Sequence, residues 1–253
     1  GASVSSSAAR KVMRRAMEYS CLFDLPVIDH CEDKDLAAGG SMNEGYYSTL
    51  LGMKVINPAA EEVQVVRDGI LSRQTGARVH IAHISTRHSL AYIVSAKREG
   101  VAITCEVTPH HLLLTDAQTT SYDTNTKMNP PLRAQEDVEA MVQGLADGSI
   151  DVIATDHAPH NANDKMLEYD YAPFGIVGSE TAGSLILDRF VRTGIIDLER
   201  LVHLMSVNPA RILKLDRGTL VKTAWADVTV LDPESDVEVR SEDFLSRSRN
   251  TPF

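Results

Sequence analysis

The sequence has few cysteines and no long apolar run, and each shortage excludes a class of protein. Its 253 residues include three cysteines, Cys21, Cys31 and Cys105, which lie far apart and show no paired spacing. This usage favours a reduced compartment over a disulfide-stabilised secreted protein, so we expect a cytoplasmic location. No run approaches the roughly 18 apolar residues of a membrane span, and the basic amino-terminal stretch lacks the apolar centre of a secretory signal.

Positive charge is also in deficit. The chain has 25 Lys and Arg residues against 35 Asp and Glu residues, which gives a net charge of −10. This balance argues against a broad surface for nucleic acid or for an anionic membrane, and it leaves a small-molecule substrate open. The apolar share of 43% and the charged share of 24% are typical of a globular domain.

Both ends of the sequence lack features of a complete chain. Gly1 stands where an initiator methionine is expected, and the last residues, NTPF, follow no closing element. We therefore expect a piece of a longer protein, truncated at both ends.

Apolar runs and helix-forming stretches alternate along the chain. The predicted strands cover 25–28, 78–82, 101–107 and 150–154, with a late, half-exposed strand at 227–231. The predicted helices cover 5–18, 46–51, 58–76, 89–98, 136–145, 180–193, 198–205 and 209–213, and 115–127 is predicted as a loop. Alternating βα units of this size indicate an α/β fold with a parallel sheet, and four units make half of an eight-stranded barrel.

Polar residues follow each predicted strand, most densely in IDVIATDHAPH at 150–160. The candidates, in strand order, are His30, His83, His110 with His111, and Asp156 with His157 and His160. The carboxyl ends of barrel strands carry catalytic groups, and imidazole and carboxylate are zinc ligands. A lone strand-end histidine is more often a hydrogen-bonded polar residue, and Asp156 could simply cap a helix. Two histidines and an aspartate on separate strands favour a metal site.

Six ordered segments give the chain a resemblance to a known family. They are VIDHCED (27–33), HIAHIST (80–86), EVTPHHLLLT (106–115), KMNPPLR (127–133), ATDHAPH (154–160) and APFGIVGSET (172–181), and the closing EDFLSRSRNTPF also fits. The chain resembles the cyclic amidohydrolases of the amidohydrolase superfamily, and among them the dihydroorotases of the long bacterial type. The NPPLR and DHAPH segments distinguish these from hydantoinases, dihydropyrimidinases and allantoinases.

The resemblance implies a particular architecture. Residues 1–215 would form the C-terminal half of a (β/α)8 TIM barrel, and 216–253 a fragment of a small composite β domain with a return segment. The family's His-x-His, its substrate-binding arginine and its bridging metal ligand do not occur in this sequence. We expect them upstream of Gly1.

The resemblance also implies roles for individual residues. His30 and His83 would bind zinc, as one or two ions, and Asp156 would bind the metal and carry protons. Asn129 and His160 would bind substrate, and the main chain at Phe174 and Gly175 would contact it. It assigns no firm role to His110, His111, His157 or Arg133.

The implied activity is the reversible cyclisation of N-carbamoyl-L-aspartate to L-dihydroorotate in pyrimidine synthesis. Two alternatives stay open: another cyclic amidohydrolase, or a non-catalytic homologue that acts as a partner of aspartate carbamoyltransferase. The resemblance is compatible with a homodimer and with that carbamoyltransferase association.

Overall fold

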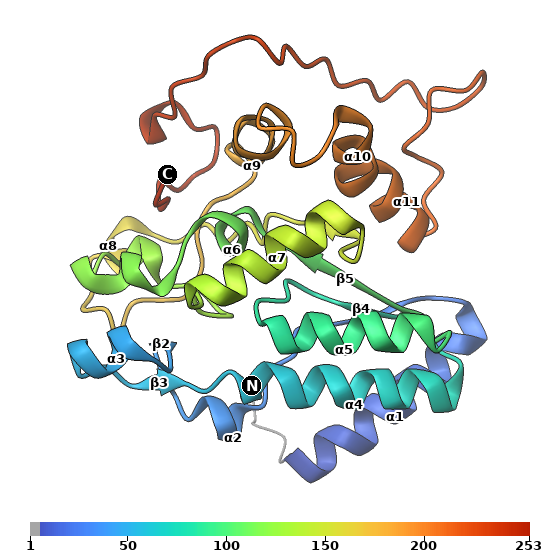
Figure 1. Cartoon of the computed structure of the whole chain (residues 1–253), viewed down its shortest axis with the longest axis horizontal. Helices are drawn as coiled ribbons and strands as arrows, with labels where there is room; N and C mark the ends of the chain where they lie inside the picture. Colours follow the sequence, from blue (N-terminus) through green and yellow to red (C-terminus); the bar gives the residue numbers. More distant parts are fainter. Residues whose placement is uncertain (1–5) are drawn as a thin grey trace.

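A four-stranded parallel sheet organises the chain in the computed structural model, which describes residues 6–253 (Figure 1). The strand order is β1–β4–β5–β6, with bounds Val27–Asp29, Val79–Ile81, Ile103–Val107 and Val152–Ile153. Every pairing between neighbours is parallel, which confirms the predicted βα organisation. The connections that follow the strands therefore meet along one edge of the sheet, where ligand sites form in such folds.

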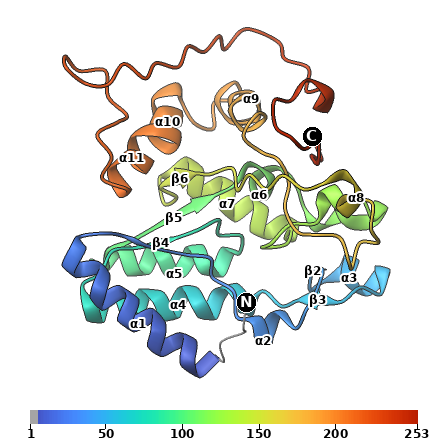
Figure 2. The ribbon, with the colours of Figure 1, turned by 180° about the vertical axis from the view of Figure 1, so that it is seen from behind.

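Long helices connect successive strands. α4 (Ala59–Thr75) precedes β4, α5 (Arg87–Arg98) links β4 to β5, and α7 (Gln135–Asp147) precedes β6. α1 (Ser6–Phe23) packs beside α4 (Figures 1 and 2). Ser5, where the sequence predicts the first helix to begin, lies outside the described residues.

Local signals set the helix ends. The Thr86 hydroxyl accepts a hydrogen bond from the Ser89 N–H at the start of α5. Gly76 ends α4 in the left-handed region, at φ 74°, where glycine has no steric cost.

The main core lies between the sheet and these helices. Its fully buried aliphatic side chains include Val65 of α4, Ile81 of β4, Ile93 of α5 and Leu145 of α7. Burial of each such side chain contributes about 1.5–3 kcal/mol. The sheet is thus a rigid support for the connections at its carboxyl edge.

A small insertion separates β1 from α4. It contains α2 (Lys34–Ala37), α3 (Tyr46–Leu51) and a two-stranded parallel sheet of β2 (Met42–Asn43) and β3 (Val55–Ile56). The sequence predicts one short helix here, at 46–51, and its bounds are confirmed.

Short helical elements occupy much of the remaining chain. They are α6 (Pro109–Leu113), η1 (Asp116–Ser121), η2 (Thr124–Thr126), α8 (Ala162–Lys165) and η5 (Ser241–Asp243). We did not predict α6, although Thr108 caps it and Pro109 opens it. η1 and η2 fall in the predicted loop at 115–127. None of the described helices is long and apolar enough to cross a membrane.

Two predicted helices each continue from α-helix into a π-helical turn. α9 (Ala182–Ile186) continues as the π-helical turn η3 (Leu187–Val191), and α10 (Leu198–Val202) as η4 (His203–Val207), followed by α11 (Asn208–Ile212). Ile186 and Leu204 of these elements are fully buried in the main core.

The predicted strand at 227–231 is wrong. The segment after α11 runs past α9 and α10 as an extended chain, and 227–231 contains no strand (Figure 1). Val228 is 63% exposed and Val230 is 89% exposed. Alternation of apolar residues makes a strand only where a neighbouring strand accepts its hydrogen bonds, and no described strand pairs with this segment.

Candidate active site at the carboxyl ends of the strands

Two histidines meet where β1 and β4 end. His30 Nδ1 lies 3.0 Å from His83 Nε2, and the two rings pack edge to face with centroids 4.8 Å apart. His83 is 8% exposed, and its Nδ1 is buried without a hydrogen-bond partner among the described residues. Imidazole nitrogens are common metal ligands, and those of His30 and His83 converge here. The second nitrogen of the His83 ring has no other partner to satisfy it among the described residues.

Glu32, a carboxylate that we did not predict as functional, links this pair to Asn129. Its Oε2 lies 3.8 Å from His30 Nε2, and its Oε1 accepts a hydrogen bond of 2.8 Å from Asn129 Nδ2. The hydrogen-bonding interaction with Glu32 is the main cause of the raised pKa of His30, and the same interaction with His30 is the main cause of the lowered pKa of Glu32. The sequence spacing could have indicated this role, because Glu32 follows His30 by two positions. Side chains two residues apart on extended backbone point to the same side.

Replacing Glu32 with glutamine should lower metal affinity or activity by about 10–100-fold, because a carboxylate beside a ligating histidine orients its ring. Metal content after equilibrium dialysis, together with kcat/KM of the full-length gene product, measures the effect. Glu44→Gln is the matched control, since Glu44 is an exposed glutamate that accepts a hydrogen bond from Asn57. Equal losses in the two variants would contradict the role of Glu32.

Asp156 follows β6 and is exposed. It adopts φ 46°, and His83 adopts φ 32°, both in a region that non-glycine residues rarely occupy. Such strained positions cluster at functional sites. Burial is the main cause of the lowered pKa of His83, the neighbouring His30 lowers that pKa further, and the negative charge of Asp156 opposes both. Asp156 is thus within electrostatic reach of the histidine pair.

A different group of candidate ligands lies closer together. Among the described residues, only Asp29, Cys31 and Asp68 place three candidate ligand atoms within 4.8 Å of one another. Arg67 already pairs with both carboxylates, at 2.8 Å from Asp29 Oδ2 and 2.6 Å from Asp68 Oδ1. This group is an ion-pair cluster. The structure brings His30 and His83 together, and the place of Asp156 in their ligand set stays a prediction.

Of the three remaining strand-end histidines, His111 and His157 form hydrogen bonds with main-chain groups. His111 Nε2 donates a hydrogen bond of 3.0 Å to the Pro130 carbonyl, and burial lowers the pKa of His111 to about 4. Burial also lowers the pKa of His110, whose Nε2 has no partner in the described part of the chain. His157 Nδ1 accepts a hydrogen bond of 3.2 Å from the Gly178 N–H.

Three of the predicted substrate residues lie together. His160 Nε2 donates a hydrogen bond of 2.7 Å to the Phe174 carbonyl. Gly175 has φ 109°, and a Cβ there would lie 2.6 Å from the Ala158 Cβ, so only glycine permits this approach. Asn129, the fourth predicted substrate residue, lies instead beside the histidine pair, because it donates a hydrogen bond to Glu32.

Two buried lysines hold the loop at 161–178 through main-chain carbonyls. Lys127 Nζ donates to the Tyr169 carbonyl at 2.7 Å, and Lys165 Nζ donates to the carbonyls of Thr124 and Pro173, both at 2.9 Å. Burial is the main cause that lowers the pKa of Lys165 to about 8.

The titration of Lys165 predicts a pH dependence of stability. An unfolded lysine keeps its proton up to about pH 10.4, whereas folded Lys165 loses it near pH 8. The unfolded state binds more protons between these values, so the free energy of unfolding should rise with pH there, by roughly 1–3 kcal/mol. Lys165→Met should remove this rise, and Lys54→Met, at an exposed position, should keep it. Urea unfolding across the window measures it, and parallel profiles for wild type and Lys165→Met would contradict the assignment.

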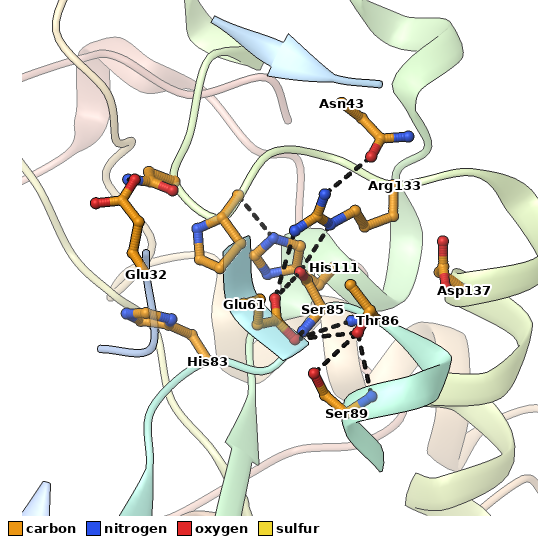
Figure 3. A network of polar contacts seen from close by, with 12 residues as sticks. Glu32, Asn43, Glu61, His83, Ser85, Thr86, Ser89, His111, Arg133 and Asp137 are labelled. Atoms are coloured by element: carbon orange, nitrogen blue, oxygen red, sulfur yellow. Dashed lines mark hydrogen bonds and ion pairs between the residues drawn. The ribbon is translucent and has the colours of Figure 1, made fainter. Parts of the chain in front are cut away.

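A buried ion pair lies beside the turn that follows His83 (Figure 3). Arg133 Nη2 lies 3.5 Å from Glu61 Oε2, and their side chains are 2% and 4% exposed. Glu61 Oε1 accepts hydrogen bonds from the main-chain N–H groups of Ser85 at 3.0 Å and Thr86 at 3.1 Å. Arg133 Nε donates to Ser85 Oγ, and Nη1 donates to Asn43 Oδ1, both at 2.9 Å.

This network fixes two stretches of backbone that carry site residues. Ser85 and Thr86 follow His83 in the turn before α5, and Arg133 closes the segment that begins near Asn129. Arg133, to which the sequence assigned no role, therefore joins α4, β2 and the β4–α5 turn.

Comparison with known proteins shows the family to which this chain belongs. Residues 3–251 match the amidohydrolase family, and the chain belongs to it. It is 53% identical to a dihydroorotase of Pelotomaculum thermopropionicum, over 96% of this chain and 57% of that protein. It is 52% identical to a dihydroorotase of Caldanaerobacter subterraneus subsp. tengcongensis, over 96% and 56%. The chain spans about half the length of the curated relatives it matches.

Solved structures of cyclic amidohydrolases share the fold. An L-hydantoinase (dihydropyrimidinase) from Arthrobacter aurescens superposes with a TM-score of 0.81 at 25% identity, over 95% of this chain and 54% of that one. A D-hydantoinase (dihydropyrimidinase) from Thermus sp. gives a TM-score of 0.74 at 24% identity, over 88% and 50%. The predicted fold, a partial barrel of this superfamily, is confirmed.

Proposed function

We propose that this chain contributes the second half of the active site of a zinc-dependent dihydroorotase. The enzyme would interconvert N-carbamoyl-L-aspartate and L-dihydroorotate in cytoplasmic pyrimidine synthesis. The observation that carries the proposal is the contact between His30 and His83 at the ends of adjacent strands. The 53% identity to a dihydroorotase over nearly the whole chain supports this substrate over other cyclic amides.

The residues present fit zinc. Imidazole nitrogen and carboxylate oxygen are its common ligands, and the buried His83 Nδ1 is unsatisfied among the described residues. His30, His83 and Asp156 would hold one or two ions, with further ligands upstream of Gly1. The chemistry that zinc supplies at such a site is the activation of water near neutral pH and the polarisation of a carbonyl.

Asp156 is the proton carrier in this proposal. In ring opening its carboxylate accepts a proton from the attacking water as the new C–O bond forms. It then donates that proton to the amide nitrogen as the ring C–N bond breaks. Ring closure runs through the same two transfers in reverse.

Substrate orientation falls to two polar side chains and one stretch of main chain. Asn129 and His160 would bind the carboxylate and amide edges of the substrate, and the main chain at Phe174 and Gly175 would contact the ring. Holding the amide near Asp156 in this way lowers the entropic cost of the reaction.

Turnover by the full-length gene product tests the proposal. We expect activity on dihydroorotate in both directions, loss of activity after chelation and recovery with zinc. Turnover of dihydrouracil, a hydantoin or allantoin without turnover of dihydroorotate would contradict it. The division into 1–215 and 216–253, a homodimer and the carbamoyltransferase association remain predictions.

A further inference from the structure

Asn250, near the end of the chain, bridges two of the segments that carry proposed substrate residues. The residue is 6% exposed, and its side-chain Nδ2 donates hydrogen bonds of 3.1 Å to the carbonyls of both Ala158 and Gly175. Its Oδ1 accepts a hydrogen bond of 3.3 Å from the His160 N–H. One amide therefore holds the DHAPH segment against the 174–175 loop.

Ser248 completes this junction from the same segment. Its hydroxyl donates to the His160 carbonyl at 2.7 Å and also contacts Asn250 Oδ1. The Asn250 carbonyl accepts a hydrogen bond of 2.9 Å from the Val177 N–H. Both main-chain polar groups of His160 are thus held by residues 248–250.

The chemistry of the junction is specific to asparagine. Its amide offers two N–H donors and one carbonyl oxygen, and all of them are used here. An aspartate would place a carboxylate against the carbonyl oxygens of Ala158 and Gly175, which need donors. Gly175 and Ala158 are so close that a Cβ on Gly175 would clash with the Ala158 Cβ, so the Asn250 amide bridges two closely packed segments.

The segment around Asn250 is anchored on both sides. On one side the Glu180 carboxylate accepts hydrogen bonds from the N–H groups of Leu245 at 2.7 Å and Ser246 at 3.0 Å. On the other side Phe253 packs against a small cluster of buried apolar side chains, Met128, Leu132 and Ile176. These anchors fix where the amide of Asn250 lies.

We propose that Asn250 is a positioning residue that sets His160 and the 174–175 loop for substrate binding. The inference rests on the proposed function, because that function gives His160, Phe174 and Gly175 their substrate contacts. Asn250 acts through these residues, since its own polar atoms are all engaged with protein.

Steady-state kinetics of the full-length, zinc-loaded enzyme test the inference. Asn250→Ala and Asn250→Asp should each raise KM for dihydroorotate by about 10–100-fold with a much smaller change in kcat, because displaced contact groups weaken binding. Ser248→Ala, which removes one hydrogen bond to His160, should raise KM by about threefold to tenfold.

Asn208→Ala is the matched control. Asn208 Nδ2 donates one hydrogen bond of 2.8 Å to the Asp151 carbonyl, at the opposite end of β6 from Asp156. This variant should lower the melting temperature without raising KM. A similar rise of KM in Asn208→Ala would overturn the inference, because general loosening of the fold would then explain the effect.

The remaining outcomes are also decisive. If Asn250→Ala does not fold, Asn250→Asp and Ser248→Ala give the result, and an unchanged KM in both overturns the inference. Failure of the proposed function is a separate observation, because the unmodified enzyme would then not turn over dihydroorotate. The inference itself fails if the wild-type enzyme is active and the variants at Asn250 and Ser248 have the same KM as the wild type.

Discussion

Asp156→Asn should lower kcat for dihydroorotate by about 10²–10⁴-fold while leaving the fold intact, because an amide cannot accept a proton from water and return it to the leaving nitrogen. The substitution suits this position. Asp156 is exposed and has φ 46°, and asparagine tolerates positive φ about as well as aspartate. The expected loss therefore reports chemistry rather than misfolding.

Rates in both directions, with metal content and melting temperature, measure the effect. Asp164→Asn, the same substitution at an exposed position in α8, should leave all of these unchanged. Loss of metal together with activity would identify Asp156 as a ligand, and loss of activity alone would identify it as the proton carrier. A near-normal kcat in Asp156→Asn would rule out both roles.

Arg133→Met should lower the free energy of unfolding by about 3–5 kcal/mol, because it leaves Glu61 as an uncompensated buried charge. Burial opposes the ionisation of Glu61, but Arg133 and hydrogen bonds from Ser85 outweigh it and hold the pKa of Glu61 below its ordinary value. Without the guanidinium, Glu61 would take up a proton or destabilise the turn that follows His83. This loss is large relative to the ~5–15 kcal/mol that stabilises a typical domain.

Denaturant unfolding of the full-length protein measures the loss. Arg73→Met is the control, because Arg73 pairs with Glu99 at 3.0 Å with both side chains more than half exposed, and such pairs contribute less than about 1 kcal/mol. Glu61→Gln combined with Arg133→Met should recover part of the stability, since no charge remains and the glutamine oxygen still accepts from Ser85 and Thr86. A double variant no more stable than Arg133→Met alone would show that the buried charge is not the cause.

The fold was predictable where local pattern and burial coincide. The strands at 78–82 and 101–107 place most of their apolar residues in the core, and their order with the intervening helices is enough to predict a parallel sheet. The contact between His30 and His83 follows from the same reasoning, because β1 and β4 are neighbours in that sheet.

The unpredicted features depend on partners distant in sequence. Val228 and Val230 alternate as in a strand, but strand formation needs a neighbour that the described chain does not supply. The ion pair of Glu61 and Arg133 and the bridge made by Asn250 join segments whose proximity no local pattern encodes. A polar residue at a buried position shows its role only when its hydrogen-bond partners are known.

The bridge of Asn250 also sets the order in which the site can mature during synthesis. Its hydrogen bonds reach back 90 residues to His160 and 75 residues to Gly175. Ribosomes add about 5–20 residues each second, so the DHAPH segment waits on the order of 5–20 s before the group that holds it has been made. Until then the carbonyls of Ala158, His160 and Gly175 lack the partners that residues 248–250 supply. The four strands of the sheet are all made before Asn250, so the substrate-binding edge acquires its final geometry later than the sheet that supports it.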